Sequence, residues 1–123
     1  MKLAARYYVR QEQMNHHDSL YGGAMTEWMT QAAFFGIVDV LKRRDHVVMC
    51  AINNFRFVRE VALGTIVDAY YKLVKVGNSS LTIAVDARDM LQPEVVYASC
   101  EVVFVNLDEN GKSAPHGIVM AEQ

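Results

Sequence analysis

The sequence predicts an α+β fold in which one long helix packs against an antiparallel sheet. Residues 22–43 contain no proline, and their apolar side chains spread over more than one helical face, which is typical of a helix covered by other structure. Four later segments are rich in β-branched and aromatic residues, and short links with turn-forming residues join them, which favours antiparallel pairing. At 123 residues the chain is expected to form a single domain, residues 1–123.

Composition and charge narrow the possible functions. Hydrophobic residues make up 52% and charged residues 21%, which is ordinary for a folded globular protein. The net charge is −2 and no basic stripe is present, so nucleic acid is not an expected partner. No apolar run is long enough to cross a bilayer, and residues 1–10 lack the apolar middle of a signal peptide, so we expect a cytoplasmic protein without membrane contact.

The elements are expected in the following order. A strand over residues 3–10 leads into an ordered loop over 15–21, which is rich in Asn, His, Asp and Ser. The helix follows and ends at the basic residues 42–44, which suit a helix C-terminus. The strands are expected at 46–58, 65–76, 80–88 and 95–107, separated by Gly64, Gly77-Asn78 and Gln92-Pro93, and DENGK at 108–112 predicts a final tight reversal.

The two cysteines and the paired histidines suggest no metal site. Cys50 and Cys100 lie in separate apolar strand-like runs, so we expect two buried free thiols. His16 and His17 are adjacent, so their side chains diverge, and no third ligand has suitable spacing. Loop ordering is the simpler interpretation of His17, and lining a pocket or supplying a proton is the alternative.

The most informative stretch is the start of the helix. Gly22 and Gly23 leave backbone N–H groups without bulky cover, and such groups can meet a carbonyl oxygen or an anion. Glu27, Thr30 and Gln31 follow at spacings i, i+3 and i+4, so they share one face of an otherwise apolar helix. That face either lines a pocket below the glycines or is the part that the sheet leaves to water or to a dimer contact.

Four segments carry a resemblance to a known family: NHHDSLYGGAMTEWM at 15–29, VVMCAINNFRF at 47–57, GTIVDAYYKLVKVGNSSLTIAVDA at 64–87 and FVNLDENGK at 104–112. In this order they resemble the hotdog-fold acyl-CoA thioesterases, in particular bacterial acyl-CoA hydrolases related to the brain-type cytosolic enzymes. The resemblance covers nearly the whole chain. It implies a hotdog fold, with a long central helix wrapped by a curved antiparallel sheet, and a homodimer that is often assembled further into a trimer of dimers.

The resemblance also implies a reaction and a site. The reaction is hydrolysis of an acyl-CoA at the dimer interface, with coenzyme A entering as part of the substrate and no other cofactor. The N–H of Gly23, beside Gly22, would polarise the thioester carbonyl, and Asn15 would orient the water or the thioester. A local role for Asn15, bonding its own loop, is the alternative. The turn near the nucleotide would consist of Gly77, Asn78, Ser79 and Ser80.

Two positions depart from the family pattern. Thr30 stands where relatives carry an Asp or Glu that acts as base or nucleophile, and Glu60 stands where they usually carry proline. One hypothesis is that Glu27 replaces the missing acid while Thr30 holds the water. The alternative is that Glu27 only complements the positive helix start, an effect of roughly 0.3–1 kcal/mol.

Three functions remain in order of preference. The first is an acyl-CoA thioesterase, and the second is a weak or inactive hotdog protein that binds acyl-CoA without hydrolysing it. A hydratase or dehydratase ranks last because the Asp and His arrangement of those enzymes is missing. The sequence specifies neither the acyl chain nor whether the carrier is coenzyme A or acyl carrier protein.

Overall fold

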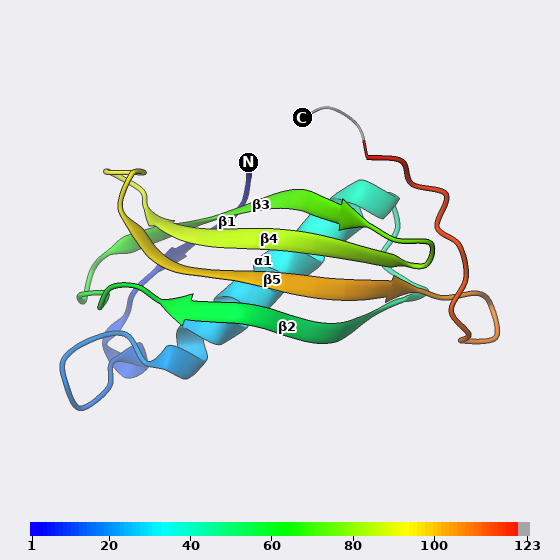
Figure 1. Ribbon diagram of the computed structural model, residues 1–123. Helices are drawn as coiled ribbons and strands as arrows, with labels where there is room; N and C mark the ends of the chain where they lie inside the picture. Colours follow the sequence, from blue (N-terminus) through cyan, green and yellow to red (C-terminus); the bar gives the residue numbers. More distant parts are fainter. Residues whose placement is uncertain (121–123) are drawn as a thin grey trace.

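The protein consists of a five-stranded antiparallel sheet with one long helix across one face (Figure 1). The structure is a computed structural model and describes residues 1–120. Its elements are β1 (Lys2–Tyr8), a 3₁₀ turn η1 (Gln11–Gln13), α1 (Gly22–Leu41), β2 (Val47–Phe57), β3 (Ile66–Val76), β4 (Ser80–Asp89) and β5 (Val96–Asn106). The predicted α+β class is confirmed, and every predicted helix and strand end lies within two residues of the observed one.

The strand order in the sheet is β1-β3-β4-β5-β2, and all neighbours are antiparallel. Strands β3, β4 and β5 follow one another through short links, while β2 pairs with β5 at one edge and β1 pairs with β3 at the other. The helix crosses behind this sheet on a diagonal (Figure 1). Its N-terminal end therefore lies at the opposite end of the sheet from the β3–β4 turn.

The core lies between α1 and the inner face of the sheet. Alternate residues of the three central strands point inward, as the period of a β-strand requires, and they meet one side of the helix. The buried helix residues are Met25, Trp28, Met29, Ala32, Ala33, Gly36 and Ile37, and the buried strand residues include Val67, Ala69, Leu73, Ile83, Val85, Val102 and Phe104.

The C-terminal half of the helix is fixed to β3 at one close contact. Gly36 packs on the ring of Tyr71, and a Cβ added at Gly36 would lie 2.7 Å from Tyr71 Cδ2. The Tyr71 hydroxyl donates to the Asp39 carboxylate, and Lys42 Nζ donates to it at 2.9 Å. These two donors, Tyr71 first, lower the pKa of Asp39 to about 2. The helix ends at Leu41, next to the basic residues expected at its end, and Lys42 caps it in the left-handed region.

The helix is only partly covered within a single chain. The sheet covers only one side of α1, so Phe34 and Phe35 on the other side are 36% and 42% exposed. An apolar pattern in a helix predicts that a face is buried, but it does not distinguish burial within one chain from burial against another chain. The uncovered side of α1 needs another surface to become buried.

The expected burial of both cysteines is correct for only one of them. Cys100 on β5 is buried, and burial raises the pKa of its thiol to about 11. Cys50 is exposed because β2 is an edge strand and its register shifts between Met49 and Ala51, which leaves Cys50 outside the pairing with β5. Both thiols are free.

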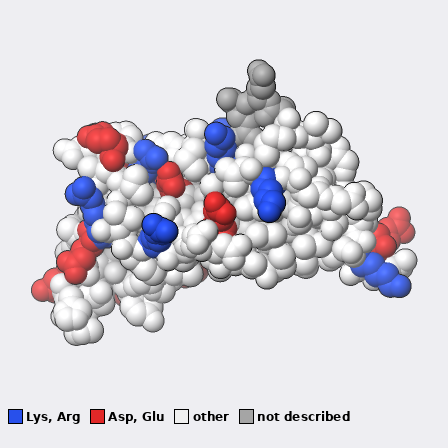
Figure 2. Space-filling view, viewed as in Figure 1, with Lys and Arg blue, Asp and Glu red and all other residues white. Residues whose placement is uncertain are grey.

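The outer face of the sheet carries charges of both signs (Figure 2). Asp68 is only 2% exposed there and accepts from Arg6 Nε at 2.6 Å and Nη2 at 2.9 Å, while Lys72 on the same face is exposed. The basic and acidic side chains are interspersed on the face shown in Figure 2 and form no continuous basic stripe. Within residues 1–120, no helix combines the length and apolar character needed to cross a membrane.

Candidate active site

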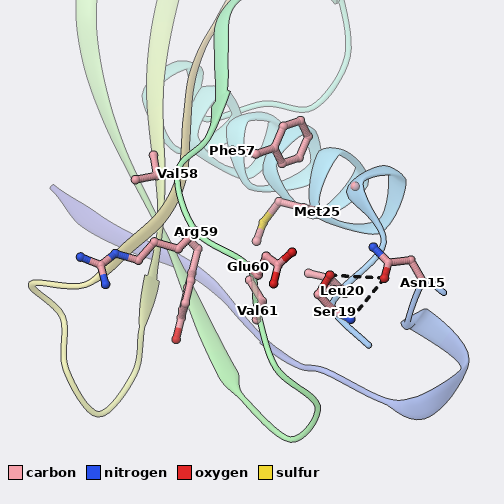
Figure 3. A pocket seen from close by; sticks show the side chains of 11 residues that line it. Asn15, Ser19, Leu20, Met25, Phe57, Val58, Arg59, Glu60 and Val61 are labelled. Atoms are coloured by element: carbon pink, nitrogen blue, oxygen red, sulfur yellow. Dashed lines mark hydrogen bonds between the residues drawn. The ribbon is translucent and has the colours of Figure 1, made fainter. Parts of the chain in front are cut away.

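A cavity of about 330 Å³ lies at the N-terminal end of α1, next to the link between β2 and β3. Its walls come from the loop before the helix, the first helical turn, the end of β2 with its link, and the start of β5 (Figure 3). The cavity brings together two of the residues expected from the sequence, Asn15 and Gly22. The full lining consists of Asn15, Ser19, Leu20, Gly22, Met25, Phe57, Val58, Arg59, Glu60, Val61 and Tyr97.

The loop over residues 15–19 is organised by the side-chain oxygen of Asn15. Asn15 Oδ1 accepts from the backbone N–H of His17 at 2.8 Å, the N–H of Ser19 at 3.2 Å and the hydroxyl of Ser19 at 3.3 Å. The backbone adds a 2.7 Å bond from the Asn15 N–H to the Ser19 carbonyl, and Asp18 takes a left-handed conformation that short polar residues tolerate. Asn15 can therefore play both expected roles. Its side-chain oxygen orders the loop, and its amide nitrogen remains free to donate to a ligand.

The amide nitrogen of Asn15 is placed for a ligand. Within the described chain no hydrogen bond from Asn15 Nδ2 is present, and Figure 3 shows this nitrogen turned away from Ser19 on the side of the helix start. An amide NH₂ group is a hydrogen-bond donor only. The group can therefore donate to an oxygen atom that enters the cavity.

The start of the helix leaves two more donors free. The cap residue Tyr21 makes no side-chain cap bond, and its carbonyl accepts from Ala24 at 3.0 Å and Met25 at 3.3 Å. Among residues 1–120, none accepts from the backbone N–H of Gly22 or Gly23. The partial positive charge of a helix N-terminus adds to these donors, so the site favours an oxygen that gains negative charge.

The two glycines have different surroundings. Gly22 lines the cavity, and a Cβ added there would make an ordinary contact of 3.6 Å with Phe57 Cζ. Gly23 is the next residue but not part of the lining, and a Cβ there would lie 2.3 Å from Tyr21 Cε2. A larger residue at position 23 would have to move the Tyr21 ring.

The predicted polar face of the helix lies outside this cavity. Glu27 and Gln31 are exposed, and none of Glu27, Thr30 and Gln31 lines the cavity. Gln31 Oε1 accepts from the Tyr7 hydroxyl at 2.6 Å, and the Tyr7 pKa is raised, mainly by burial and further by the charge of Glu27. Within one chain, this face therefore lies at the margin of the sheet: Gln31 contacts β1 through Tyr7, Thr30 is half-buried and Glu27 is exposed.

The hydroxyl of Thr30 makes its hydrogen bond within the helix. Its hydroxyl donates to the carbonyl of Thr26 at 3.0 Å and lies 3.1 Å from the carbonyl of Glu27. Such a bond from a helical threonine to the preceding turn is common and needs no ligand. The oxygen of Thr30 keeps lone pairs that can accept a hydrogen bond from water.

The remaining predicted residues lie away from the cavity. His17 is exposed in the loop, with its ring against that of His16 at a centroid distance of 3.9 Å. Gly77, Asn78 and Ser79 form the β3–β4 turn with Ser80, at the other end of the sheet (Figure 1). One chain alone does not place this turn beside Asn15 and Gly22.

The C-terminal segment crosses the β3–β4 turn. The backbone N–H of His116 donates to the carbonyl of Asn78 at 3.3 Å, and His116 Nε2 lies 3.0 Å from the carbonyl of Ser80. Gly77 closes the turn by donating to the Ser80 carbonyl at 2.9 Å. The turn is therefore braced by residues about 36 positions later in the chain.

Sequence reasoning missed the wall formed by the end of β2 and its link. Phe57, Arg59, Glu60 and Tyr97 all line the cavity, and no local motif marks them as a group. Tyr97 donates to Asp89 Oδ2 at 2.6 Å, and burial together with Asp89 raises the pKa of Tyr97 to about 12. The one available signal was Glu60, an acid where the resembling family usually has proline.

A metal-assisted site would need several ligands close together. Within residues 1–120, no three His, Cys, Asp or Glu side chains are grouped as metal ligands would be. The polar side chains that line the cavity are those of Asn15, Ser19, Arg59, Glu60 and Tyr97.

The fold is shared with solved thioesterases. A hexameric hotdog-fold thioesterase of Campylobacter jejuni is similar with a TM-score of 0.80 at 20% identity, over 94% of this chain and 90% of that one. An acyl-CoA hydrolase from Staphylococcus aureus, solved with butyryl coenzyme A and coenzyme A, is similar with a TM-score of 0.81 at 21% identity, over 90% of this chain and 66% of that one. The helix on a five-stranded antiparallel sheet is therefore a hotdog fold.

Sequence comparison identifies the family. The model of the thioesterase superfamily matches residues 17–96, which include most of the loop, the helix start and the link between β2 and β3, but neither Asn15 nor Tyr97 of the cavity lining. The chain belongs to the thioesterase superfamily. It is also 26% identical over 107 residues to an uncharacterised acyl-CoA thioester hydrolase of Haemophilus influenzae, covering 80% of this chain and 67% of that protein.

Proposed function

We propose that this protein hydrolyses an acyl-CoA thioester to the free acid and coenzyme A. The observation that carries the proposal is the pair of free N–H groups at Gly22 and Gly23, beside the free amide of Asn15, at a cavity in a member of the thioesterase superfamily. The Haemophilus relative is named for the same reaction, and the Staphylococcus structure contains acyl-CoA. We propose that residues 1–123 form one thioesterase domain.

The reaction needs stabilisation of negative charge on the thioester oxygen. When water adds to the carbonyl carbon, this oxygen becomes an oxyanion, and fixed donors in a site that excludes water lower the barrier most effectively. The N–H groups of Gly22 and Gly23 and the Asn15 amide are fixed by the helix and by the ordered loop. Collapse of the intermediate breaks the carbon–sulfur bond and releases coenzyme A.

A homo-oligomer is part of the proposal. Strand β2 is an edge strand with exposed apolar side chains at Val48, Met49, Ile52 and Phe57, and the uncovered side of α1 adds Phe34 and Phe35. Exposed apolar surface of this extent is typical of an interface. We propose that two copies pair antiparallel through β2, and that three such dimers assemble into a trimer of dimers. The Campylobacter protein of the same fold is hexameric.

Antiparallel pairing of two copies would bring the two separated parts of the predicted site close together. The β3–β4 turn and the Asn15 loop lie at opposite ends of one sheet, so a two-fold axis at β2 would turn the partner's sheet end for end. This arrangement would carry Gly77–Ser80 of one copy toward the cavity of the other, where the turn could contact the nucleotide of coenzyme A. The exposed free thiol of Cys50 fits the reducing cytoplasm, which we include in the proposal.

Thiol release from a panel of acyl-CoA substrates tests the proposed function. The panel contains short, medium, long and aromatic acyl groups, and each compound is also titrated calorimetrically to measure binding. Because Cys50 and Cys100 are free thiols, the protein itself can contribute thiol to a colorimetric assay, so only multiple turnovers count as hydrolysis. Binding without thiol release would support a protein that only binds acyl-CoA, and the absence of both would contradict the proposal.

A further inference from the structure

Glu60 is the one carboxylate among the residues that line the cavity at the helix start. Neither helix position considered from the sequence supplies a carboxylate to the cavity. Glu27 is exposed and does not line it, and position 30 carries threonine in place of the acid of the resembling family. A hydrolase in which water is the nucleophile benefits from a general base beside the carbonyl site. The cavity itself therefore offers one candidate for this role.

The backbone around Glu60 is held on both sides. Before it, the N–H groups of Val58 and Arg59 donate to the carbonyl of Tyr97 at 2.7 and 3.2 Å. After it, the carbonyl of Val61 accepts from the N–H of Leu20 at 2.9 Å, which ties the link to the loop that Asn15 organises. Glu60 thus sits on a short segment that is fixed to β5 at one end and to the helix entry at the other.

The side chain of Glu60 is available for chemistry. Glu60 is exposed, and in the part of the chain that the structure describes its carboxylate has neither a hydrogen bond nor an ion pair. Figure 3 shows it between Met25 and the Ser19–Leu20 segment, while the neighbouring Arg59 extends away from the helix. The free N–H groups at the helix start are assigned to the thioester oxygen. The unpaired carboxylate can then bind the attacking water molecule.

We propose that Glu60 is the general base of this thioesterase, taking over the role of the acid that Thr30 replaces. The inference rests on the proposed function. In the reaction the Glu60 carboxylate accepts a proton from a bound water as the water oxygen forms its bond to the thioester carbonyl carbon. The carbonyl oxygen gains negative charge at Gly22, Gly23 and Asn15, and the carbon–sulfur bond then breaks. The proton returns from Glu60 to the sulfur, so that the products are the acid and coenzyme A.

Glu60→Gln tests this role because it keeps the shape of the side chain and removes the base. We expect kcat to fall by about 10²–10⁴-fold, the usual contribution of a general base, with KM and melting temperature nearly unchanged. Glu109→Gln, in the exposed turn after β5, is the matched control and is expected to keep full activity. Glu27→Gln measures the rival base in the same assay.

Chemical rescue separates catalysis from a structural role. Glu60→Ala opens space beside the cavity, so added formate should restore part of kcat, whereas Glu60→Gln fills this space and should not respond. If Glu60→Gln does not fold, the formate response of Glu60→Ala decides the matter alone.

The outcomes distinguish this inference from the proposed function. A wild-type protein that hydrolyses acyl-CoA while Glu60→Gln keeps its kcat would overturn the role of Glu60 and leave the thioesterase intact. If kcat falls in Glu27→Gln and not in Glu60→Gln, the general base is Glu27 and the thioesterase function still stands. If the wild-type protein turns over no substrate, both the proposed function and the role of Glu60 are overturned.

Discussion

Asn15→Asp should separate the two roles that the structure gives to one side chain. The substitution keeps an oxygen acceptor for the N–H groups of His17 and Ser19 and for the Ser19 hydroxyl, so the loop should persist. It replaces the free NH₂ donor with an oxygen that carries negative charge. We expect kcat to fall at least about 10²–10³-fold, the cost of losing one oxyanion donor, while thermal stability changes little.

Asn15→Ala provides the comparison for stability. It removes the acceptor of three hydrogen bonds, each contributing roughly 0.5–1.5 kcal/mol, but water can replace part of them because the loop is partly exposed. A total loss of about 1–2 kcal/mol follows, or a fall of several degrees in melting temperature for a chain of this length.

The assay combines thiol release at saturating substrate with a thermal melt followed by circular dichroism. Asn110→Asp makes the same chemical change at an exposed turn position and serves as the control. The reasoning is refuted if Asn15→Asp retains wild-type kcat, since the amide would then not contact the reacting oxygen. It is also refuted if Asn15→Asp melts as early as Asn15→Ala, since the oxygen would then not be what orders the loop.

Two further predictions concern the attachment of the helix to β3. Gly36→Ala would place a Cβ 2.7 Å from Tyr71 Cδ2, so we expect a loss of about 1–3 kcal/mol in a thermal or urea melt. The control Gly22→Ala meets only an ordinary contact at 3.6 Å, and equal melts for the two variants would contradict the steric argument. The pKa of Asp39 is lowered to about 2, first by the Tyr71 hydroxyl and then by Lys42, so the carboxylate stabilises the fold above the ordinary pKa of 3.8 and this stability is lost as the pH falls toward 2. Tyr71→Phe should weaken this acid dependence in urea melts between these pH values, and an unchanged dependence would show that the hydroxyl is not its source.

The fold could be predicted from the sequence because its signals are local. The helix between the glycines and the basic residues, and the strands between turn residues, follow from period and from turn chemistry. Burial was harder, because periodicity does not say which surface covers a residue. The exposed side of α1 at Phe34 and Phe35 and the exposed Cys50 on the edge strand β2 both show this limit.

The candidate site could be predicted only in part. Asn15 and Gly22 lie seven residues apart, so one loop and one helix start bring them together. Glu60 reaches the same cavity through the bond between Leu20 and Val61 and through the pairing of the link with Tyr97. Those contacts join segments distant in the chain, and no spacing rule in the sequence specifies them.

The pairing of β2 with β5 affects how the chain folds as it is synthesised. β2 ends at Phe57, and its partner β5 in the same sheet is complete at Asn106, about 50 residues later. At ribosomal rates of about 5–20 residues per second, this apolar strand waits for several seconds without its neighbour. Such a wait exposes an edge that can pair with other nascent chains, and closing so long a loop also slows folding. The production of this protein should therefore respond strongly to chaperone supply and to temperature during synthesis, more than the stability of its finished sheet would suggest.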